Sequence, residues 1–259
     1  MKRVATALVL LPFIVWVVLA SPWWVFNAVL FLVGLAALQE FDGIAAAHGI
    51  PRPGAPGLAA GVALLFAPYP DAVIVLIAIL AMALALRSSD LKDALPGAAA
   101  FVLGVVYIFG AWRCARALRQ IDPSGAHWLM IALLVSWAGD TAAYYVGRAF
   151  GRHRLAPHVS PGKTWEGAFG SVAGAILAAA IYAHFFIPAF PIWGVIAIAA
   201  AANIAGQIGD LCESAFKRGG ALKDSGTTLP GHGGWLDRID STLFSVPVVY
   251  GVLKYVLRT

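Results

Sequence analysis

Four aspartates lie within or at the ends of long apolar segments of this 259-residue chain: Asp140, Asp210, Asp237 and Asp240. An ionised side chain in such a segment costs a few kcal/mol to insert into a bilayer, so it usually faces other helices or water. Two basic stretches, 148–163 and 217–238, lie close by in the sequence. Carboxylates beside Lys and Arg can hold a hard cation such as Mg²⁺ together with substrate phosphates. The pattern therefore predicts a metal-dependent phosphate chemistry such as nucleotidyl transfer.

The polar residues of these segments recur at helical spacing. One stripe is Ser136, Asp140, Tyr144 and Arg148; a second is Asn203, Gln207, Asp210, Ser214 and Lys217; a third is Asp237, Asp240 and Ser241. Residues three or four apart lie on one face of a helix, so each stripe predicts a polar face inside a bundle. For Ser136, Asn203 and Gln207, hydrogen bonds between helices explain the position as well as a site does.

The composition predicts an all-α, polytopic membrane protein. Hydrophobic residues make up 61% of the chain and charged residues 12%, with a mean hydropathy of +0.82. Since roughly 20 apolar residues cross a bilayer, about nine segments are long enough to be considered. They are 4–20, 23–47, 55–69, 71–87, 95–118, 127–149, 167–186, 192–217 and 238–256. The third and fourth, separated by Pro68 and Pro70, also fit a re-entrant pair.

No linker or soluble domain separates these segments, so we expect one integral membrane domain over 1–259. It would comprise N-terminal helices in 1–120 and a catalytic half in 121–259. Lys2 and Arg3 place the N-terminus in the cytoplasm, and nine crossings then place both basic stretches there too. One feature does not fit this orientation: three arginines lie at the outer end of the fifth segment, Arg113, Arg116 and Arg119. They would pair within the bundle or contact lipid headgroups. The net charge of +5 favours anionic lipids as partners, not nucleic acid.

The sequence SAFKRGGALKDSGTTLPGHGGWLDRID, from Ser214 to Asp240, resembles the signature of the phosphatidate cytidylyltransferase (CDP-diglyceride synthase) family. Three upstream segments, GDTAAYYVGRAFGRH, SPGKTWEG and NIAGQIGDLCES, are similar to the family in order and spacing. The resemblance is strong in the C-terminal half, and in the N-terminal half it extends only to the hydrophobic spans. Trp235 departs from the aliphatic residue or Phe that is more common there, which we expect to alter packing and not chemistry.

The resemblance implies a Mg²⁺-dependent reaction in phospholipid biosynthesis, in which CTP and phosphatidic acid give CDP-diacylglycerol and pyrophosphate. A second cation is left open. It also implies a homodimer that contacts membrane lipids, with the active site at the cytoplasmic helix ends. We expect a multi-pass protein of a bacterial inner membrane.

Roles can be assigned to the residues that match the family pattern. Asp210 and Asp237 are the first choices as metal ligands; Asp240 and Asp140 follow, with ion pairing as the alternative for the last two. The residues expected to carry catalysis are Lys217, Arg218, Lys223, Asp224, His232 and Arg238, mostly by holding phosphates; for His232, shaping the turn is an equal alternative. The residues expected to bind substrate are Arg148, Ser160, Lys163, Thr164, Ser214, Gly231, Gly233 and Gly234. Helix capping is the alternative for Ser160 and Thr164.

Two other functions fit parts of the pattern. A cytidylyltransferase for another lipid phosphate, such as an ether lipid, would carry the same signature. A transporter would also place acids and glycines inside membrane helices, but the acids here gather toward one face and no inverted repeat is evident.

Overall fold

The computed structural model describes residues 2–121, 123–228 and 233–256, and within these ranges it is mostly helical. The order of elements is α1 (Lys2–Leu19), α2 (Trp23–Ala47), α3 (Gly54–Phe66), α4 (Pro70–Ala85), η1 (Leu91–Asp93), α5 (Ala94–Val105), η2 (Val106–Gly110), α6 (Ala111–Arg119), α7 (Gly125–Phe150), β1 (Arg154–Ala156), β2 (Ser160–Thr164), α8 (Trp165–Phe186), α9 (Ile192–Gly219), α10 (Leu236–Gly251) and η3 (Val252–Val256).

Six helices of the described chain are long and apolar enough to cross a membrane. They are Trp23–Ala47, Leu91–Arg119, Gly125–Phe150, Trp165–Phe186, Ile192–Gly219 and Leu236–Val256. This confirms a polytopic helical membrane protein. Three further apolar helices, Leu10–Leu19, Gly54–Phe66 and Pro70–Ala85, are shorter than a full crossing. Nine crossings therefore stay a prediction, and the re-entrant alternative for α3 and α4 stays open.

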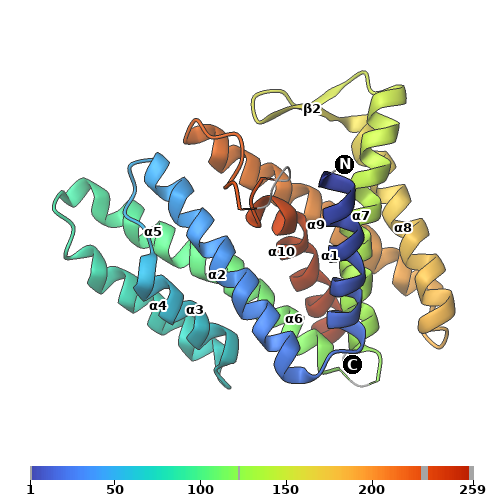
Figure 1. Cartoon of the computed structure of the whole chain (residues 1–259), viewed down its shortest axis with the longest axis horizontal. Helices are drawn as coiled ribbons and strands as arrows, with labels where there is room; N and C mark the ends of the chain where they lie inside the picture. The colour runs from blue at the N-terminus through green and yellow to red at the C-terminus, as the bar shows by residue number, and fades with distance from the viewer. Residues whose placement is uncertain (1, 122, 229–232, 257–259) are drawn as a thin grey trace. The chain divides into compact units, whose positions relative to one another are not determined.

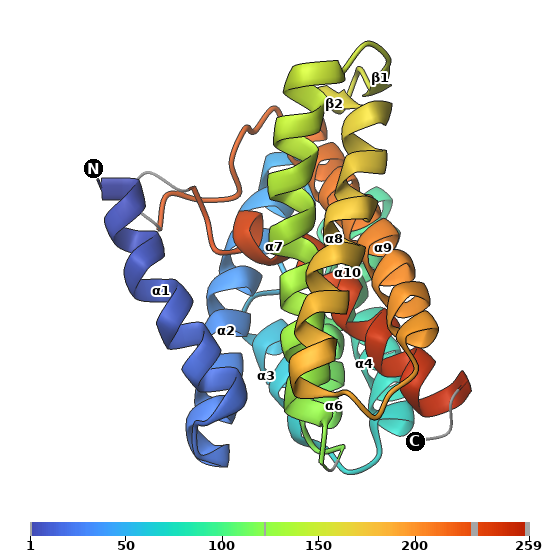
Figure 2. The same cartoon turned by 90° about the vertical axis from the view of Figure 1, so that its right-hand side faces the viewer.

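The basic stretch after α7 contains a β-hairpin that the all-α prediction did not include. Strand β1 pairs antiparallel with β2, and the register shifts between Arg154↔Thr164 and Ala156↔Ser160. The hairpin extends beyond the ends of α7 and α8 (Figure 2). Strands of three and five residues that include Pro161 and Gly162 carry no strand signal in the sequence, because both residue types are depleted in strands.

The chain divides into two compact units. The first unit comprises 1–9, 22–113 and 216–238, and the second comprises 10–21, 114–215 and 239–259. Helices α9 and α10 belong mainly to the second unit, while the last turn of α9 and the first turn of α10 belong to the first. The expectation of one domain stays a prediction.

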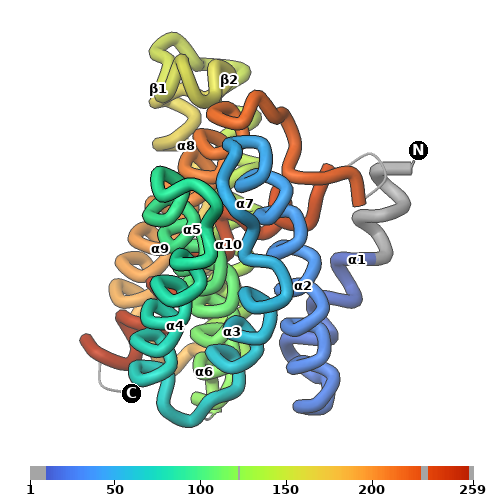
Figure 3. The backbone as a smooth tube through the Cα atoms, turned by 90° about the vertical axis from the view of Figure 1, so that its left-hand side faces the viewer, coloured from blue at the N-terminus to red at the C-terminus, as the bar shows by residue number. Residues whose placement is uncertain are grey.

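Within the first unit, α2, α3, α4 and α5 pack beside one another (Figures 1 and 3). Phe109 of η2 is fully buried at their centre. Its ring lies where side chains at Gly34 of α2 and Gly61 of α3 would be, since a Cβ on either would approach it to 2.8 or 2.2 Å. Small residues at these positions let the helix backbones approach closely, which is the usual basis of helix association in membranes.

Within the second unit, α7 and α8 run side by side along most of their length (Figure 2). Glycines on α8 make this possible: a Cβ at Gly170 would lie 2.7 Å from Val146, and one at Gly174 would lie 2.5 Å from Ala142. Asn203 of α9 adds polar contacts, with Nδ2 donating to the Val135 carbonyl at 3.2 Å and to Ser171 Oγ at 3.1 Å. The interhelical alternative is thus confirmed for Asn203.

Two of the three arginines around α6 bond to backbone carbonyls within their own unit. In the first unit, Arg113 Nη1 donates to the Leu65 carbonyl at 3.3 Å. In the second, Arg119 Nη2 donates to the Ser21 carbonyl at 2.6 Å. For both, contacts inside the protein are confirmed, while the orientation in the membrane stays a prediction.

Replacing Gly61 by alanine should destabilise the protein, because the new Cβ would meet the Phe109 ring at 2.2 Å. Overpacking of this kind costs about 1–3 kcal/mol. Gly43→Ala on α2 is the matched control, since nothing lies within 4 Å of its Cβ. Thermal unfolding in one detergent should show a lower midpoint for Gly61→Ala alone. Equal midpoints for the two variants would contradict the described packing.

Candidate functional site

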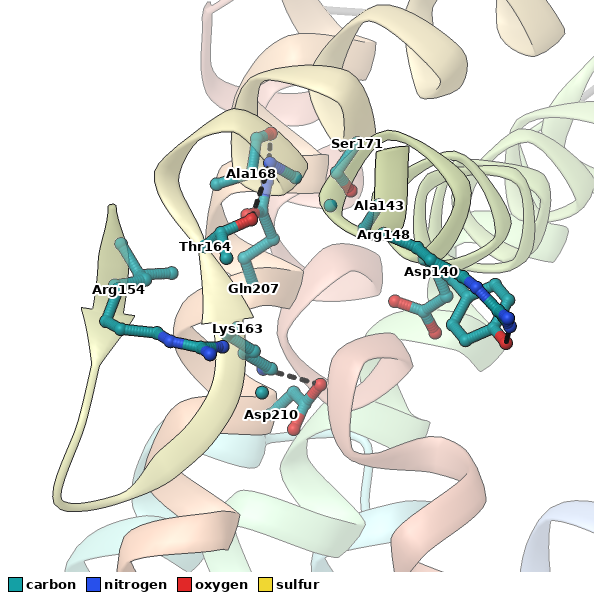
Figure 4. A pocket seen from close by; sticks show the side chains of 15 residues that line it. Asp140, Ala143, Arg148, Arg154, Lys163, Thr164, Ala168, Ser171, Gln207 and Asp210 are labelled. Atoms are coloured by element: carbon teal, nitrogen blue, oxygen red, sulfur yellow. Dashed lines mark hydrogen bonds and ion pairs between the residues drawn. The ribbon is translucent and has the colours of Figure 1, made fainter. Parts of the chain in front are cut away.

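A pocket of about 520 Å³ lies in the second unit, between α7, the hairpin, α8 and α9 (Figure 4). Its size suits a small molecule such as a nucleotide or a lipid headgroup. It is lined by Asp140, Ala143, Tyr144, Gly147, Arg148, Arg154, Leu155, Gly162, Lys163, Thr164, Gly167, Ala168, Ser171, Gln207 and Asp210.

The polar stripe of α7 forms one wall of the pocket, as its spacing predicts. Asp140, Tyr144 and Arg148 all line it, and Arg148 Nη1 donates to the Tyr144 hydroxyl at 2.9 Å. Ser136, the fourth member of the stripe, is buried and lies 3.3 Å, Oγ to Oγ, from Ser245. The stripe therefore serves helix packing at one end and the pocket at the other.

The opposite wall joins the hairpin to α9. Lys163 Nζ lies 2.7 Å from Asp210 Oδ2, and both side chains are 28% exposed, so the pair remains open to the pocket. Figure 4 shows the pair facing the carboxylate of Asp140 across the pocket. Arg154 Nη1 donates to the Pro161 carbonyl at 2.8 Å, which holds its side chain along the hairpin.

Two residues of the β2–α8 junction fix the hairpin in place. Thr164 caps α8, because its Oγ1 accepts a hydrogen bond from Gly167 N at 3.1 Å. Glu166 accepts from the backbone of Arg152 at 3.1 Å and from the His153 ring at 2.6 Å. Capping by Thr164 is thus confirmed, whereas Ser160, also considered as a cap, lies in β2 and does not line the pocket.

The charges of the pocket can hold an anion and a cation together. Arg148, Arg154 and Lys163 contribute three positive charges, and Asp140 and Asp210 contribute two negative ones. Lys and Arg form charge-assisted hydrogen bonds to phosphate oxygens. Carboxylate oxygens are the ligands that Mg²⁺ takes alongside substrate phosphates.

Further acids lie near Asp210 in the second unit. Asp240 is 8% exposed and Glu213 1% exposed. Like-charge repulsion from Asp210, Glu213 and Asp140 acts on Asp240, whose Oδ1 accepts from Ser241 N at 2.6 Å. Such a concentration of negative charge favours a cation. Sequence reasoning did not include Glu213, although it lies one helical turn after Asp210.

Among the described residues, no group of three or more His, Cys, Asp or Glu is arranged to hold a metal ion by itself. The donor set fits a cation that takes one or two carboxylates and completes its shell with substrate oxygens and water, as Mg²⁺ does. The metal-ligand roles of Asp140, Asp210, Asp237 and Asp240 stay predictions.

Most of the signature segment, residues 216–238, belongs to the first unit, where it builds a compact network around Asp237. The carboxylate of Asp237 pairs with Lys217 Nζ and also accepts from Ser225 N at 3.0 Å and Gly234 N at 2.9 Å. The side chains of Lys217 and Asp237 are 9% and 6% exposed. Gly233 has a φ of +78°, a conformation that glycine adopts without strain.

Other signature residues are exposed on this segment. Arg218, Lys223, Asp224 and Arg238 all face solvent, and Arg218 Nη1 donates to the Leu222 carbonyl at 2.8 Å. Ser214, assigned to substrate binding, belongs to the second unit and donates to Asp210 Oδ1 at 3.4 Å. Gly231 and His232 lie outside the described residues.

Glu40 of α2 is a residue of this network that sequence reasoning missed. It is 6% exposed and accepts hydrogen bonds from the signature segment. The sequence did mark it, since Glu40 and Asp42 are the two ionisable residues of a largely apolar 25-residue helix. The sequence did not link Glu40 to the signature segment, because the two lie far apart along the chain.

The chain matches the sequence model described as the cytidylyltransferase family over residues 1–256. A protein of Haemophilus influenzae named phosphatidate cytidylyltransferase is 41% identical over 153 residues, which cover 57% of this chain and 53% of that protein. The protein of the same name from Bacillus subtilis is 39% identical over 151 residues, covering 58% and 56%. The one from Staphylococcus haemolyticus is 34% identical over 229 residues, covering 85% and 86%.

The matched region thus spans about half the length of the Haemophilus and Bacillus relatives and most of the staphylococcal one. The resemblance seen in the signature is confirmed, and the match extends through the N-terminal helices. With a family match over nearly every residue and a relative similar along most of its length, the chain belongs to the cytidylyltransferase family.

Proposed function

We propose that this protein is a phosphatidate cytidylyltransferase, which joins the CMP unit of CTP to phosphatidic acid and releases pyrophosphate. The observation that carries the proposal is the pocket of the second unit, where three cationic side chains and two carboxylates meet in a family whose named relatives carry this activity. Both substrates are phosphate anions, so their binding needs the charges that this pocket provides.

The reaction needs no covalent enzyme intermediate. An oxygen of the phosphatidate phosphate attacks the α-phosphorus of CTP, and a new P–O bond forms as the bond to the β-phosphate oxygen breaks. Pyrophosphate leaves with that electron pair. Because the attacking oxygen is already anionic, the protein has to position the two phosphates and neutralise their charge more than it has to remove a proton.

The side chains of the chain itself supply much of this neutralisation. Lys163, Arg148 and Arg154 would bind phosphates in the pocket, since phosphate can replace the contact of Lys163 with Asp210. In the first unit, Lys217 would act in the same way, held by Asp237. Exposed Arg218, Lys223 and Arg238 would contact the anionic substrates from the signature segment, with Asp224 orienting a lysine or a water.

Mg²⁺ is the proposed cofactor, and a second cation remains compatible with the number of acids. When bound, it would neutralise the triphosphate and help pyrophosphate to leave. Within the second unit, Asp210, Asp140 and Asp240 are the proposed ligands; within the first, Asp237 is a proposed ligand. Asp140 and Asp210 both line the pocket, which supports a cation held there by one or two carboxylates.

The chemistry of the two substrates also indicates where the active site lies relative to the membrane. Phosphatidic acid lies in the leaflet with its phosphate at the interface, and CTP is a cytosolic nucleotide, so the active site should lie at the cytoplasmic helix ends of a bacterial inner membrane. A cytoplasmic N-terminus and nine crossings agree with the basic residues of stretches 148–163 and 217–238. A homodimer is proposed from the family resemblance.

Purified protein in detergent should convert CTP and phosphatidic acid to CDP-diacylglycerol and pyrophosphate when Mg²⁺ is added. Pyrophosphate release and the lipid product should appear in equal amounts and disappear with excess chelator. An ether-linked phosphatidate tested alongside separates the two lipid classes. No pyrophosphate with either lipid would reject the proposed activity and favour a transporter.

Replacing Lys163 by glutamine should lower kcat/KM by about 100-fold, because it removes one charged donor to the phosphates. Lys92→Gln is the matched control: Lys92 also pairs with an aspartate, Asp90 at 2.9 Å, but is 76% exposed and lies outside the pocket. Steady-state kinetics of both variants test the assignment. Similar small losses in the two variants would contradict a phosphate-binding role for Lys163.

Asp237→Asn should abolish turnover, with a loss of more than about 100-fold per folded molecule. The substitution keeps the size of the side chain but removes the charge that holds Lys217 and, as proposed, a cation. Activity measured across a Mg²⁺ titration checks this. Near-normal rates at every Mg²⁺ concentration would exclude Asp237 as a metal ligand.

A further inference from the structure

Glu40 is a buried carboxylate in the largely apolar helix α2. It lies in α2, is 6% exposed, and belongs to the first unit together with the signature segment. Burying a carboxylate costs several kcal/mol unless hydrogen bonds replace its water. A buried acid in such a position therefore has a structural or functional partner that compensates this cost.

Four donors of the signature segment provide that compensation. Ser225 Oγ donates to Oε2 at 2.8 Å and Thr228 Oγ1 to Oε1 at 2.6 Å. Trp235 N donates to Oε1 at 2.9 Å and Leu236 N to Oε2 at 2.8 Å. An ionised carboxylate offers about four acceptor positions. The donors are all neutral and belong to the protein, so Glu40 is saturated without a metal ion.

Glu40 binds described residues on both sides of positions 229–232. Ser225 and Thr228 precede residues 229–232, and Trp235 and Leu236 follow them. Leu236 begins α10, so Glu40 binds backbone N–H groups at the start of that helix. Such groups have no partner within their own helix, and negative charge near them is favourable. Glu40 thus caps α10 from another helix.

The backbone around Glu40 is closely fitted to it. A Cβ at Gly234 would lie 2.2 Å from Glu40 Oε2, and one at Gly226 would lie 2.8 Å from Oε1. Glycines at these two positions let the segment approach the carboxylate from both sides. This close approach is independent of the hydrogen bonds and indicates that the segment is shaped around Glu40.

Ser225 connects Glu40 to the Asp237 network. Its hydroxyl donates to Glu40 and accepts from Asp237 N at 3.3 Å, while its backbone N donates to the Asp237 carboxylate at 3.0 Å. Directly after α2, its C-cap residue His48 has Nε2 2.7 Å from the carbonyl oxygen of Phe216, the residue before Lys217. Helix α2 and its C-cap therefore contact the chain beside both members of the Lys217–Asp237 pair.

We propose that Glu40 is a positioning residue for the cytidylyl transfer: it holds the signature segment so that Lys217 and Asp237 are presented to phosphates and cation. The proposal rests on the function proposed above. Glu40 itself does not touch substrate, since its acceptor positions are used by the loop. Its effect on the reaction passes through Ser225 and the first turn of α10.

The test compares Glu40→Gln with Asp42→Asn on the same helix. Glutamine has the same shape, but its amide NH₂ would face donors where a carboxylate oxygen now accepts. Asp42 accepts from Gly54 N at 3.2 Å and does not contact the signature segment, so it controls for loss of a carboxylate on α2. The measurements are kcat, KM for CTP, the Mg²⁺ concentration for half-maximal rate, and thermal unfolding in detergent.

Glu40→Gln should lower kcat and raise the Mg²⁺ requirement by about 10- to 100-fold, as loss of a residue supporting a metal site does. Asp42→Asn should stay within about twofold of the unmodified protein. Ser225→Ala should change both quantities in the same direction, and the double variant should fall little below Glu40→Gln, because the two residues act through one contact. An unchanged Mg²⁺ requirement, with activity lost only in proportion to folded protein, would overturn the proposal.

Hydrogen exchange distinguishes failure of this proposal from failure of the proposed activity. In Glu40→Gln, amide exchange should rise in residues 223–228 and 233–238 and stay unchanged in the hairpin of the second unit. That readout needs no substrate. If the unmodified protein released no pyrophosphate yet exchange rose as expected, the activity would be wrong and the anchoring right. Unchanged exchange would refute the anchoring itself.

Discussion

The need to compensate buried negative charge governs much of this protein. Carboxylates in apolar helices lose their hydration, and for three of them, Glu40, Asp237 and Asp210, donors or a cation stand in its place. Glu40 is surrounded by four neutral donors of the signature segment. Asp237 accepts from backbone N–H groups and pairs with Lys217, and Asp210 pairs with Lys163. Lysine partners and backbone donors differ in what a ligand can do to them. A lysine can leave the carboxylate and bind a phosphate, whereas a backbone N–H group stays in place.

This difference distinguishes a carboxylate with a structural role, Glu40, from one that faces the pocket, Asp210. Glu40 is enclosed by neutral donors of the signature segment, so it organises the described residues of that segment around itself. Lys163 and Asp210 are each 28% exposed and face a pocket of about 520 Å³, so a ligand can reach them. The exposure of Lys163 and Asp210 therefore makes this pair accessible to substrate and metal ions.

Close backbone approach makes these contacts possible. Glycines stand where the polar groups meet: Gly234 beside Glu40, and Gly139 beside Asn203, where a Cβ would lie 2.3 Å from the amide nitrogen. In a membrane helix, small residues allow both tight packing and short polar contacts. The apolar helices thus do more than cross the bilayer, because their small residues set the distances at which the polar groups of the site can bond.

Much of the fold could be predicted from residue periodicity, and parts of it could not. The stripe of Asp140, Tyr144 and Arg148 follows directly from spacing and lines the pocket. The β-hairpin was missed because its short strands include Pro161 and Gly162, which give no strand pattern. Hydropathy located the long helices, but α3 and α4 are too short for length alone to decide whether they cross.

The sequence by itself determined the membrane character, the helical faces and the family signature, because composition, periodicity and motif are local properties of the chain. Only the tertiary structure decided which polar residues meet. Ser225 and Glu40 are 185 positions apart, and nothing in their local sequence marks them as partners. Contacts of this kind depend on how helices pack, and packing is set by the shapes of many side chains at once. For that reason the chemical groups of the site could be named in advance, while the residue that holds the signature segment could not.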